Sequence, residues 1–247
     1  MWRNTMRFAA VLCRHLPPQM NPQNLTASLK KMILESAVKF SRPARTIAWS
    51  RALCSAPKDY GVPNPSWSAE MMSLYERYSA KGAESWERLP SYKRYLTYSA
   101  GGQCLSRLHK PTARLFTRNL EEEGAGFEYT VFANKAERRA VCLFQAGPLL
   151  EGPPGHVHGG AIATIIDSAT GICATYLTGF VMTANLNINY RNPIPLGSVV
   201  LVECELDRTE GRKTFVSCRI TSADGSKLHA EATALFVSVS VGTLIGF

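Results

Sequence analysis

The feature that most constrains the fold is one long apolar segment in the second half of the chain. Residues 159–177 follow a glycine-rich turn and are predicted to form a single helix. The segments after it alternate apolar and polar residues, which is typical of antiparallel strands with one covered face. Two further strand-like segments precede it, at 127–132 and 141–145. We therefore predict an α+β fold in which an antiparallel sheet wraps around one long central helix. The strands expected after the helix cover 185–190, 202–207, 216–220 and 229–239.

The basic charge of the chain lies entirely in its N-terminal part. The chain has 28 Lys and Arg against 19 Asp and Glu, a formal net charge of +9. Residues 1–58 hold ten of the basic residues and one acid, which leaves 18 basic and 18 acidic residues in the remainder. Because the rest of the chain has no excess charge, its composition does not support nucleic-acid binding.

The composition of residues 1–58 is that of a mitochondrial transit peptide, rich in Arg and Lys, with hydroxyl residues and few acids. A disordered basic tail without a targeting role is the alternative, and a cytoplasmic pool stays open. A secretory signal is disfavoured because the apolar run at 8–13 is short and basic residues follow at once. No segment reaches the ~18–20 apolar residues that span a bilayer, so we expect no transmembrane segment.

The cysteines give no sign of a disulfide framework or a metal site. Seven are scattered along the chain without a Cys-x-x-Cys pair. Cys142, Cys204 and Cys218 fall within strand patterns, where a free cysteine behaves as a small buried apolar residue. We expect a reducing compartment, no structural disulfides and no bound metal.

Residues 59–112 are predicted to form a helical N-terminal extension to the sheet domain at 113–240. Ser66 is the predicted N-cap of its first helix, and Gly82 is the predicted stop. The final residues, 241–247, form an apolar tail whose role the sequence leaves open. One face of the first helix collects apolar residues at helical spacing, namely Trp67, Met71, Leu74, Tyr75 and Tyr78.

A lone carboxylate, Asp167, lies within the apolar central helix. Burying an ionised carboxylate costs several kcal/mol unless it is paired or hydrogen-bonded. The glycines at the helix start leave backbone N–H groups at a partly positive end, where developing negative charge is stabilised. A carboxylate base and an oxyanion-binding helix end are the two parts that an acyl-transfer site needs. The alternative is a structural Asp167 that hydrogen-bonds a neighbouring Ser or Thr.

The spacing along this helix predicts a site shared between two chains. Gly159 and Asp167 are eight residues apart, and at ~1.5 Å per residue this separates them by roughly 12 Å. One acyl carbonyl group cannot contact both within a single chain. A two-fold homodimer would place Asp167 of one chain near the helix start of the other, and two-fold dimers are the commonest symmetric assembly.

The residues around this helix resemble a known family. His-Gly-Gly, six further residues and Asp span 158–167 and follow Glu-Gly-Pro-Pro-Gly at 151–155. This pattern is similar to the central helix of hotdog-fold acyl-coenzyme A thioesterases, most closely their mitochondrial group. The apolar C-terminal tail departs from the family, whose members end in polar residues. The resemblance covers roughly residues 59–238 and continues in shorter segments at 63–67, 86–93, 126–129, 141–145 and 182–190.

The resemblance implies a hotdog fold and hydrolysis of medium-to-long-chain fatty acyl-CoA to free fatty acid and coenzyme A. It also implies a mitochondrial location and a homodimer or larger assembly. No metal or redox cofactor is implied, since coenzyme A is part of the substrate. Two other functions stay open. One family member is named for modulating a kinase, so the chain is alternatively a binding protein with a protein kinase partner. It is otherwise a hotdog protein that binds acyl-CoA without hydrolysing it.

The family also assigns roles to individual residues. By resemblance, Asp167 orients or deprotonates water, or attacks the thioester directly, and Thr183 helps to hold the water. The backbone N–H in the His158–Gly159 region polarises the thioester carbonyl. The side chain of His158 is either a general acid or base or, as we prefer, a cap for the helix. A metal at His156 and His158 is disfavoured because no Cys or acid cluster completes the site.

Four polar residues near strand ends are candidates for binding coenzyme A. Such residues are usually solvated, but coenzyme A presents a 3′-phosphate and a diphosphate, which suit Arg and Lys. By resemblance, the positions that contact the coenzyme are Asn189, Arg191, Arg212 and Lys213.

A hotdog hydratase is disfavoured because it uses an Asp-x4-His pair, and no Asp precedes His158 by five residues.

Overall fold

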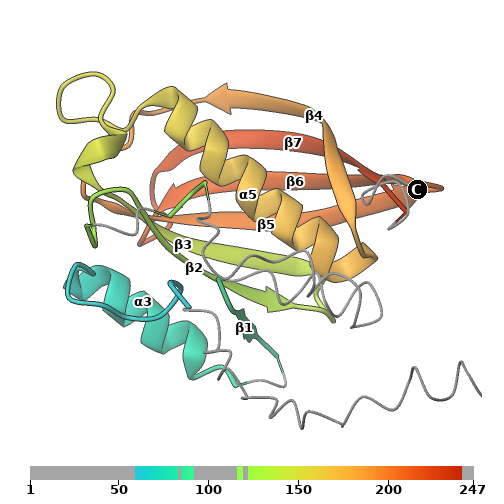
Figure 1. Cartoon of the computed structure of the whole chain (residues 1–247), viewed down its shortest axis with the longest axis horizontal. Helices are drawn as coiled ribbons and strands as arrows, with labels where there is room; N and C mark the ends of the chain where they lie inside the picture. The colour runs from blue at the N-terminus through green and yellow to red at the C-terminus, as the bar shows by residue number, and fades with distance from the viewer. Residues whose placement is uncertain (1–58, 83–84, 92–115, 119–121, 241–247) are drawn as a thin grey trace, which may run out of the picture. The chain divides into compact units, whose positions relative to one another are not determined.

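The computed structural model describes residues 59–82, 85–91, 116–118 and 122–240. A long helix lies across the concave face of a curved antiparallel sheet, and a shorter helix packs on the outer face (Figure 1). This arrangement confirms the predicted α+β architecture. The predictions for the leader and the C-terminal tail lie outside the described residues, as does the helical state expected for 92–112.

In the described residues, seven strands form one sheet in the order β1-β2-β3-β5-β6-β7-β4, and every neighbouring pair is antiparallel. β4, the first strand after the long helix, pairs with β7 at one edge of the sheet, while β1 forms the other edge. All strands expected from alternation are present, with bounds that differ by a few residues. The bounds are Glu87–Leu89 (β1), Phe127–Asn134 (β2), Arg139–Ala146 (β3), Val181–Tyr190 (β4), Val199–Glu210 (β5), Lys213–Ser222 (β6) and Leu228–Ser238 (β7).

The long helix α5 (Gly159–Thr178) supplies the centre of the core. Ile165 and Ile166 are fully buried against the sheet, and each contributes roughly 1.5–3 kcal/mol of burial free energy. By length and mean hydropathy (1.3), α5 could cross a membrane, so the prediction that no segment reaches this length is wrong. Half of the helix is buried within the protein, which is typical of a core helix.

The shorter helix α3 (Ala69–Ser79) packs over β3 on the outer face of the sheet. Its N-cap is Ser68, whose hydroxyl accepts a hydrogen bond from the Met71 N–H. The prediction of Ser66 as the N-cap is therefore wrong. Ser66 stays outside the helix because its N–H and its hydroxyl both donate to Asn64 Oδ1.

The N-terminal extension is not purely helical, because Glu87–Leu89 form strand β1 and pair with β2. This corrects the helical prediction for 59–112. Two side chains of the sheet hold the segment that precedes α3. Glu128 accepts from Trp67 Nε1 at 2.9 Å, and Gln145 bonds both a backbone N–H and a backbone carbonyl of that segment. The described extension is therefore packed as part of the sheet domain.

The cysteines of the described strands and of α5 are small core residues, as predicted for those in strands. Burial raises the pKa of Cys173 to about 12 and raises the pKa of Cys142 well above its ordinary value. The free, buried cysteines of the described residues are Cys142, Cys173, Cys204 and Cys218.

Candidate active site

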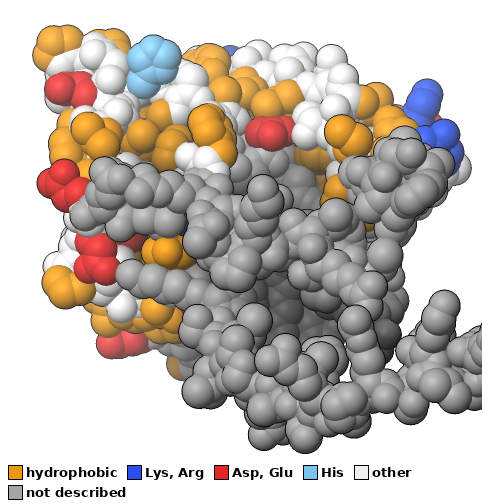
Figure 2. All heavy atoms as spheres, viewed as in Figure 1, with side chains coloured by type: hydrophobic (Ala, Val, Ile, Leu, Met, Phe, Trp, Pro, Cys, Tyr) orange, Lys and Arg blue, Asp and Glu red, His pale blue; other side chains and the backbone are white. Residues whose placement is uncertain are grey.

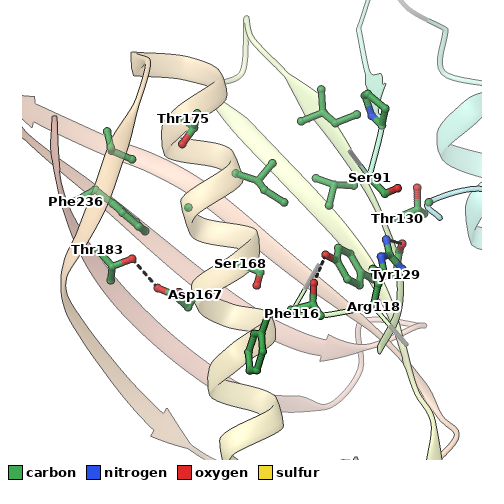
Figure 3. Close-up of a pocket in the computed structure, with 18 of the residues that line it drawn as sticks. Ser91, Phe116, Arg118, Tyr129, Thr130, Asp167, Ser168, Thr175, Thr183 and Phe236 are labelled. Atoms are coloured by element: carbon green, nitrogen blue, oxygen red, sulfur yellow. Dashed lines mark hydrogen bonds between the residues drawn. The ribbon is translucent and has the colours of Figure 1, made fainter. Parts of the chain in front are cut away.

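The site centres on Asp167, which lies on the side of α5 turned away from the sheet. The Thr183 hydroxyl donates a hydrogen bond to Asp167 Oδ1 at 2.9 Å (Figure 3). Thr183 belongs to the start of β4, so this bond joins the helix to the edge strand. The structure therefore brings together two of the residues to which the sequence assigns catalysis.

A β-bulge explains why Thr183 faces the helix. Side chains alternate along a regular strand, so Thr183 and Asn185 would point to the same face. The register of β4 with β7 shifts between these two residues. The extra residue reverses the alternation and turns Thr183 towards α5, as bulges near functional sites commonly do. Beyond the bulge, Leu186 packs against the core.

At the N-terminus of α5, one backbone N–H has no acceptor among the residues that the structure describes. His158 is the N-cap, and its Nδ1 accepts from the Gly160 N–H at 2.8 Å. The His158 N–H itself donates to the Leu150 carbonyl at 2.8 Å. Within the described part of the chain, the Gly159 N–H has no acceptor. The imidazole is thus a helix cap, and of the His158–Gly159 pair only Gly159 keeps a free N–H for a carbonyl oxygen.

A pocket of about 610 Å³ opens beside Asp167. Its floor is the outward side of α5, and its walls come from β4, β2, the end of β1 and residues 116–118. The lining combines apolar and hydroxyl side chains, as ligand-binding pockets commonly do. In the space-filling view, most described side chains on this face are hydrophobic or uncharged (Figure 2).

The four candidates for binding coenzyme A lie in two pairs at opposite ends of the sheet. Lys213, which follows Arg212, pairs with Val237 of β7. Val237 also pairs with Met182, so Arg212 and Lys213 lie near the start of β4. Asn189 and Arg191 lie at the other end of β4, roughly 25 Å away at ~3.3 Å per residue. One chain therefore does not bring all four together.

Each pair of coenzyme candidates lies at an end of β4 that contacts a different part of α5. Tyr190 donates its hydroxyl hydrogen to the Gly159 carbonyl at 3.0 Å, which places the second end of β4 beside the helix N-terminus. The bond between Thr183 and Asp167 places the first end beside the carboxylate. The exposed salt bridge of Arg191 with Glu231, at 3.0 Å, is of a kind worth only about 0–1 kcal/mol. Arg191 can therefore exchange this partner for a phosphate.

The two histidines near the helix start do not converge on a metal. His156 Nδ1 lies 2.9 Å from the Pro154 carbonyl, and His158 Nδ1 is occupied by the Gly160 N–H. In the ranges that the structure describes, no group of three His, Cys, Asp or Glu side chains is arranged to hold a metal ion.

Sequence reasoning missed most of the pocket lining. Part of it carries a signal, because four lining residues of α5 follow Asp167 at one, four, five and eight residues, the repeat of one helix face. These residues are Ser168, Gly171, Ile172 and Thr175. By contrast, Phe116 and Arg118 belong to no periodic segment, and only the folded chain places them at the pocket.

Comparison with known proteins supports the same family as the site. Residues 154–229 match the thioesterase superfamily. The chain is 56% identical over 186 residues to acyl-coenzyme A thioesterase THEM4 of Xenopus laevis, covering 74% of this chain and 82% of that protein. It is 38% identical over 189 residues to acyl-coenzyme A thioesterase THEM5 of Homo sapiens, covering 74% and 76%.

A more distant relative is the uncharacterized mitochondrial membrane protein FMP10 of Saccharomyces cerevisiae. The two are 28% identical over 119 residues, which cover 47% of this chain and 49% of that protein. The matches to THEM4 and THEM5 each cover about three quarters of this chain. This chain therefore belongs to the THEM4 and THEM5 family of acyl-coenzyme A thioesterases and has the hotdog fold of the thioesterase superfamily.

Proposed function

We propose that this protein hydrolyses medium-to-long-chain fatty acyl-CoA to free fatty acid and coenzyme A. The observation that carries the proposal is the Asp167 carboxylate, oriented by Thr183 beside a pocket of about 610 Å³. Membership of the acyl-CoA thioesterase family supports the reaction. The apolar part of the pocket lining gives an alkyl chain a place to bind.

Asp167 starts the reaction either as a general base or as a nucleophile. As a base, it takes a proton from water, and the hydroxide adds to the thioester carbonyl carbon. The C–S bond then breaks, and the thiolate of coenzyme A takes up a proton. As a nucleophile, the carboxylate attacks the same carbon, and the C–S bond breaks to release the thiolate of coenzyme A. Water later hydrolyses the acyl anhydride, which releases the fatty acid and restores the carboxylate. In both routes Thr183 holds one carboxylate oxygen in place, and its own oxygen can accept a hydrogen bond from water.

Both routes put negative charge on the carbonyl oxygen of the thioester, and a hydrogen-bond donor is needed to stabilise this charge. The free N–H of Gly159 lies at the partly positive end of α5 and suits this role. The His158 cap holds the first turn of the helix in shape. In this proposal His158 is a positioning residue, and the Gly159 N–H contacts the reacting oxygen.

We further propose a two-fold homodimer in which each site combines the helix start of one chain with Asp167 of the other. The separation of Gly159 and Asp167, roughly 12 Å along the helix, supports this arrangement. The positions of the coenzyme candidates at opposite ends of β4 support it independently. If the β4 edges of two chains pair antiparallel, one pair of candidates from each chain would lie near the same coenzyme. Among the described strands, none pairs with the outer side of β4, which leaves that edge free for a second copy.

A mitochondrial location is part of the proposal. The acid-poor, Arg- and Lys-rich composition of residues 1–58 supports it. The name of the distant yeast relative, a mitochondrial protein, agrees with this location.

Two variants and their mixture test the shared site. Asp167→Asn should lower kcat by about 10²- to 10⁴-fold without loss of the folded state. Gly159→Pro removes the free N–H at the first helical position, where proline is tolerated, and should also inactivate the enzyme. Co-expression of the two should restore roughly a quarter of wild-type activity, since half of the dimers are mixed and each has one intact site.

The controls are hydrolysis of an acyl-CoA series by each single variant, followed with a thiol-trapping dye, and the mass of the assembly. A mixture no more active than its parents would show that the site does not combine two chains. An Asp167→Asn enzyme with wild-type kcat would overturn the site assignment altogether.

A further inference from the structure

The pocket beside Asp167 has a second, polar end. Arg118 and Thr130 line it, and they are only 6% and 1% exposed. Both lie with Ser91 and Tyr129 on the opposite side of α5 from Asp167 (Figure 3). The pocket therefore runs from a carboxylate, across the outward side of the helix, to a buried cation.

Neutral groups alone hold Arg118 within the described residues. Its guanidinium donates to the carbonyls of Phe127 at 3.3 Å and Tyr129 at 2.6 Å. It also lies 3.6 Å from the centre of the Tyr129 ring. β1 pairs with β2 only from Val131 onward, so the edge of β2 before Val131 has no strand beside it. The contacts of Arg118 hold its side chain at this uncovered part of the edge. No carboxylate of the described chain forms an ion pair with Arg118.

Two buried polar atoms of the residues at this end, Arg118 Nε and Thr130 Oγ1, have no hydrogen-bond partner among the described residues. Thr221 Oγ1 is the one other such side-chain atom in the described ranges. Buried polar groups are almost always bonded, and a buried cation without a counter-charge costs several kcal/mol. Both atoms belong to residues that line the same pocket, which points to a ligand that accepts a hydrogen bond from each of them.

We propose that this end of the pocket binds a carboxylate at the far end of the acyl chain, so that ω-carboxyacyl-CoA thioesters are preferred substrates. The carboxylate would accept from Arg118 Nε–H and from the Thr130 hydroxyl, and would supply the missing counter-charge. A water molecule or a chain-end hydroxyl would satisfy the hydrogen bonds but not the charge. Ile172, in the same lining, would hold the methylene chain between the two ends. The inference rests on the proposed thioester hydrolysis at Asp167.

The test compares kcat/KM for a straight-chain acyl-CoA and the ω-carboxyacyl-CoA of matched length. Hydrogen bonds to a charged group predict a preference of at least about tenfold for the ω-carboxyl substrate. Thr130→Val keeps the shape of the side chain but removes the hydroxyl, and should reduce the preference roughly tenfold. Thr130→Ser keeps the hydroxyl and should retain the preference. Arg118→Met should abolish it.

Equal kcat/KM for the two substrates, or a preference that survives both Thr130→Val and Arg118→Met, would overturn the proposal. If Arg118→Met loses cooperative thermal unfolding, the comparison of Thr130→Val with Thr130→Ser decides alone.

If the folded wild-type protein hydrolyses neither thioester, the proposed function fails, and ligand binding then decides this inference separately. A long-chain dicarboxylic acid should raise Tm more than the monocarboxylic acid of equal length, and Thr130→Val should remove the difference. Equal shifts in the wild-type protein would contradict a carboxylate-binding end.

Discussion

The hydroxyl of Thr183 donates to Asp167 Oδ1 at 2.9 Å, across 16 residues of chain. The Thr183→Val variant should lower kcat by roughly 10- to 100-fold, because the carboxylate loses the donor that orients it. Thr183→Ser keeps the hydroxyl and should remain close to the wild-type rate. Steady-state hydrolysis of one acyl-CoA by the three proteins measures this, with KM expected to change less than kcat. A Thr183→Val enzyme at wild-type kcat would show that the bond does not position the carboxylate.

The same bond shows where sequence reasoning stops. Alternation from Asn185 onward identifies β4 because the pattern is local to the strand. The bulge that turns Thr183 towards α5 adds a single residue and leaves no mark in the polarity of the sequence. The resemblance to a family, and not the periodicity, led to Thr183 as a site residue.

The polar end of the pocket could not be predicted for a related reason. β1 pairs with only one part of the β2 edge. Arg118 is buried because its guanidinium forms hydrogen bonds with backbone carbonyls in the remaining part. The pairing of β1 with β2 joins segments that are remote in sequence, and no local pattern predicts where it stops along β2. The central helix, by contrast, was predictable, since an apolar run and its glycine-rich start are adjacent in the chain.

The free N–H of Gly159 can be removed without disturbing the helix. Gly159 is the first helical residue, and the preceding His158 has ψ 136°, the extended conformation that proline requires of its predecessor. Gly159→Pro should therefore fold, yet lose about 10²- to 10³-fold in kcat if this N–H stabilises the oxyanion.

Gly159→Ala is the matched control, because it keeps the N–H. Its Cβ would meet only the Tyr190 ring, at 3.9 Å, which is ordinary contact. Both variants are checked by circular dichroism and then assayed with the same acyl-CoA. If Gly159→Pro and Gly159→Ala have equal kcat, the N–H has no part in the reaction.

Gly171 occupies the pocket floor in the middle of α5, where glycine is unfavourable. An added Cβ would lie 3.6 Å from Phe236 Cε1, an ordinary contact distance. Gly171→Ala should therefore stabilise the protein by about 0.5–1 kcal/mol. It should also reduce kcat/KM for long acyl chains more than for short ones, because the methyl group narrows the floor.

Urea unfolding and an acyl-length series measure these two effects of Gly171→Ala separately. Thr178→Ala, also on α5 but outside the pocket lining, serves as the control for a substitution to alanine in this helix. An unchanged length profile in the more stable Gly171→Ala enzyme would show that acyl chains do not cross the helix here.

The contact of Asp59 with Arg88, at 2.8 Å, predicts an acid-sensitive contribution to stability. Burial opposes ionisation, but hydrogen bonds from Arg88 and from the backbone of Ser91 and Gly61 hold the pKa of Asp59 below its ordinary 3.8. A carboxyl with a lowered folded-state pKa stabilises the protein above its unfolded-state pKa and loses this effect as pH falls through the folded-state value.

Near neutral pH, Asp59→Asn should therefore destabilise the protein by about 1–2 kcal/mol. As the pH falls below 3.8, the difference between the two proteins should shrink, because the wild-type carboxyl becomes neutral as well. Urea midpoints at a series of pH values measure this. A difference that stays constant down to the acid limit of folding would contradict the assignment.

The buried carboxylate of Glu128 anchors the N-terminal extension to the sheet. It accepts from Trp67 Nε1 at 2.9 Å, from Asn64 Nδ2 at 3.0 Å and from the Gly124 N–H at 3.1 Å. Glu128→Ala would leave these donors without their acceptor and should destabilise the protein by about 2–4 kcal/mol. Glu122→Ala, at an exposed position nearby, should change the free energy of unfolding by less than about 0.5 kcal/mol. Because Trp67 is itself buried and bonded to Glu128, its fluorescence reports release of the extension, and equal urea midpoints for the two variants would refute the anchor.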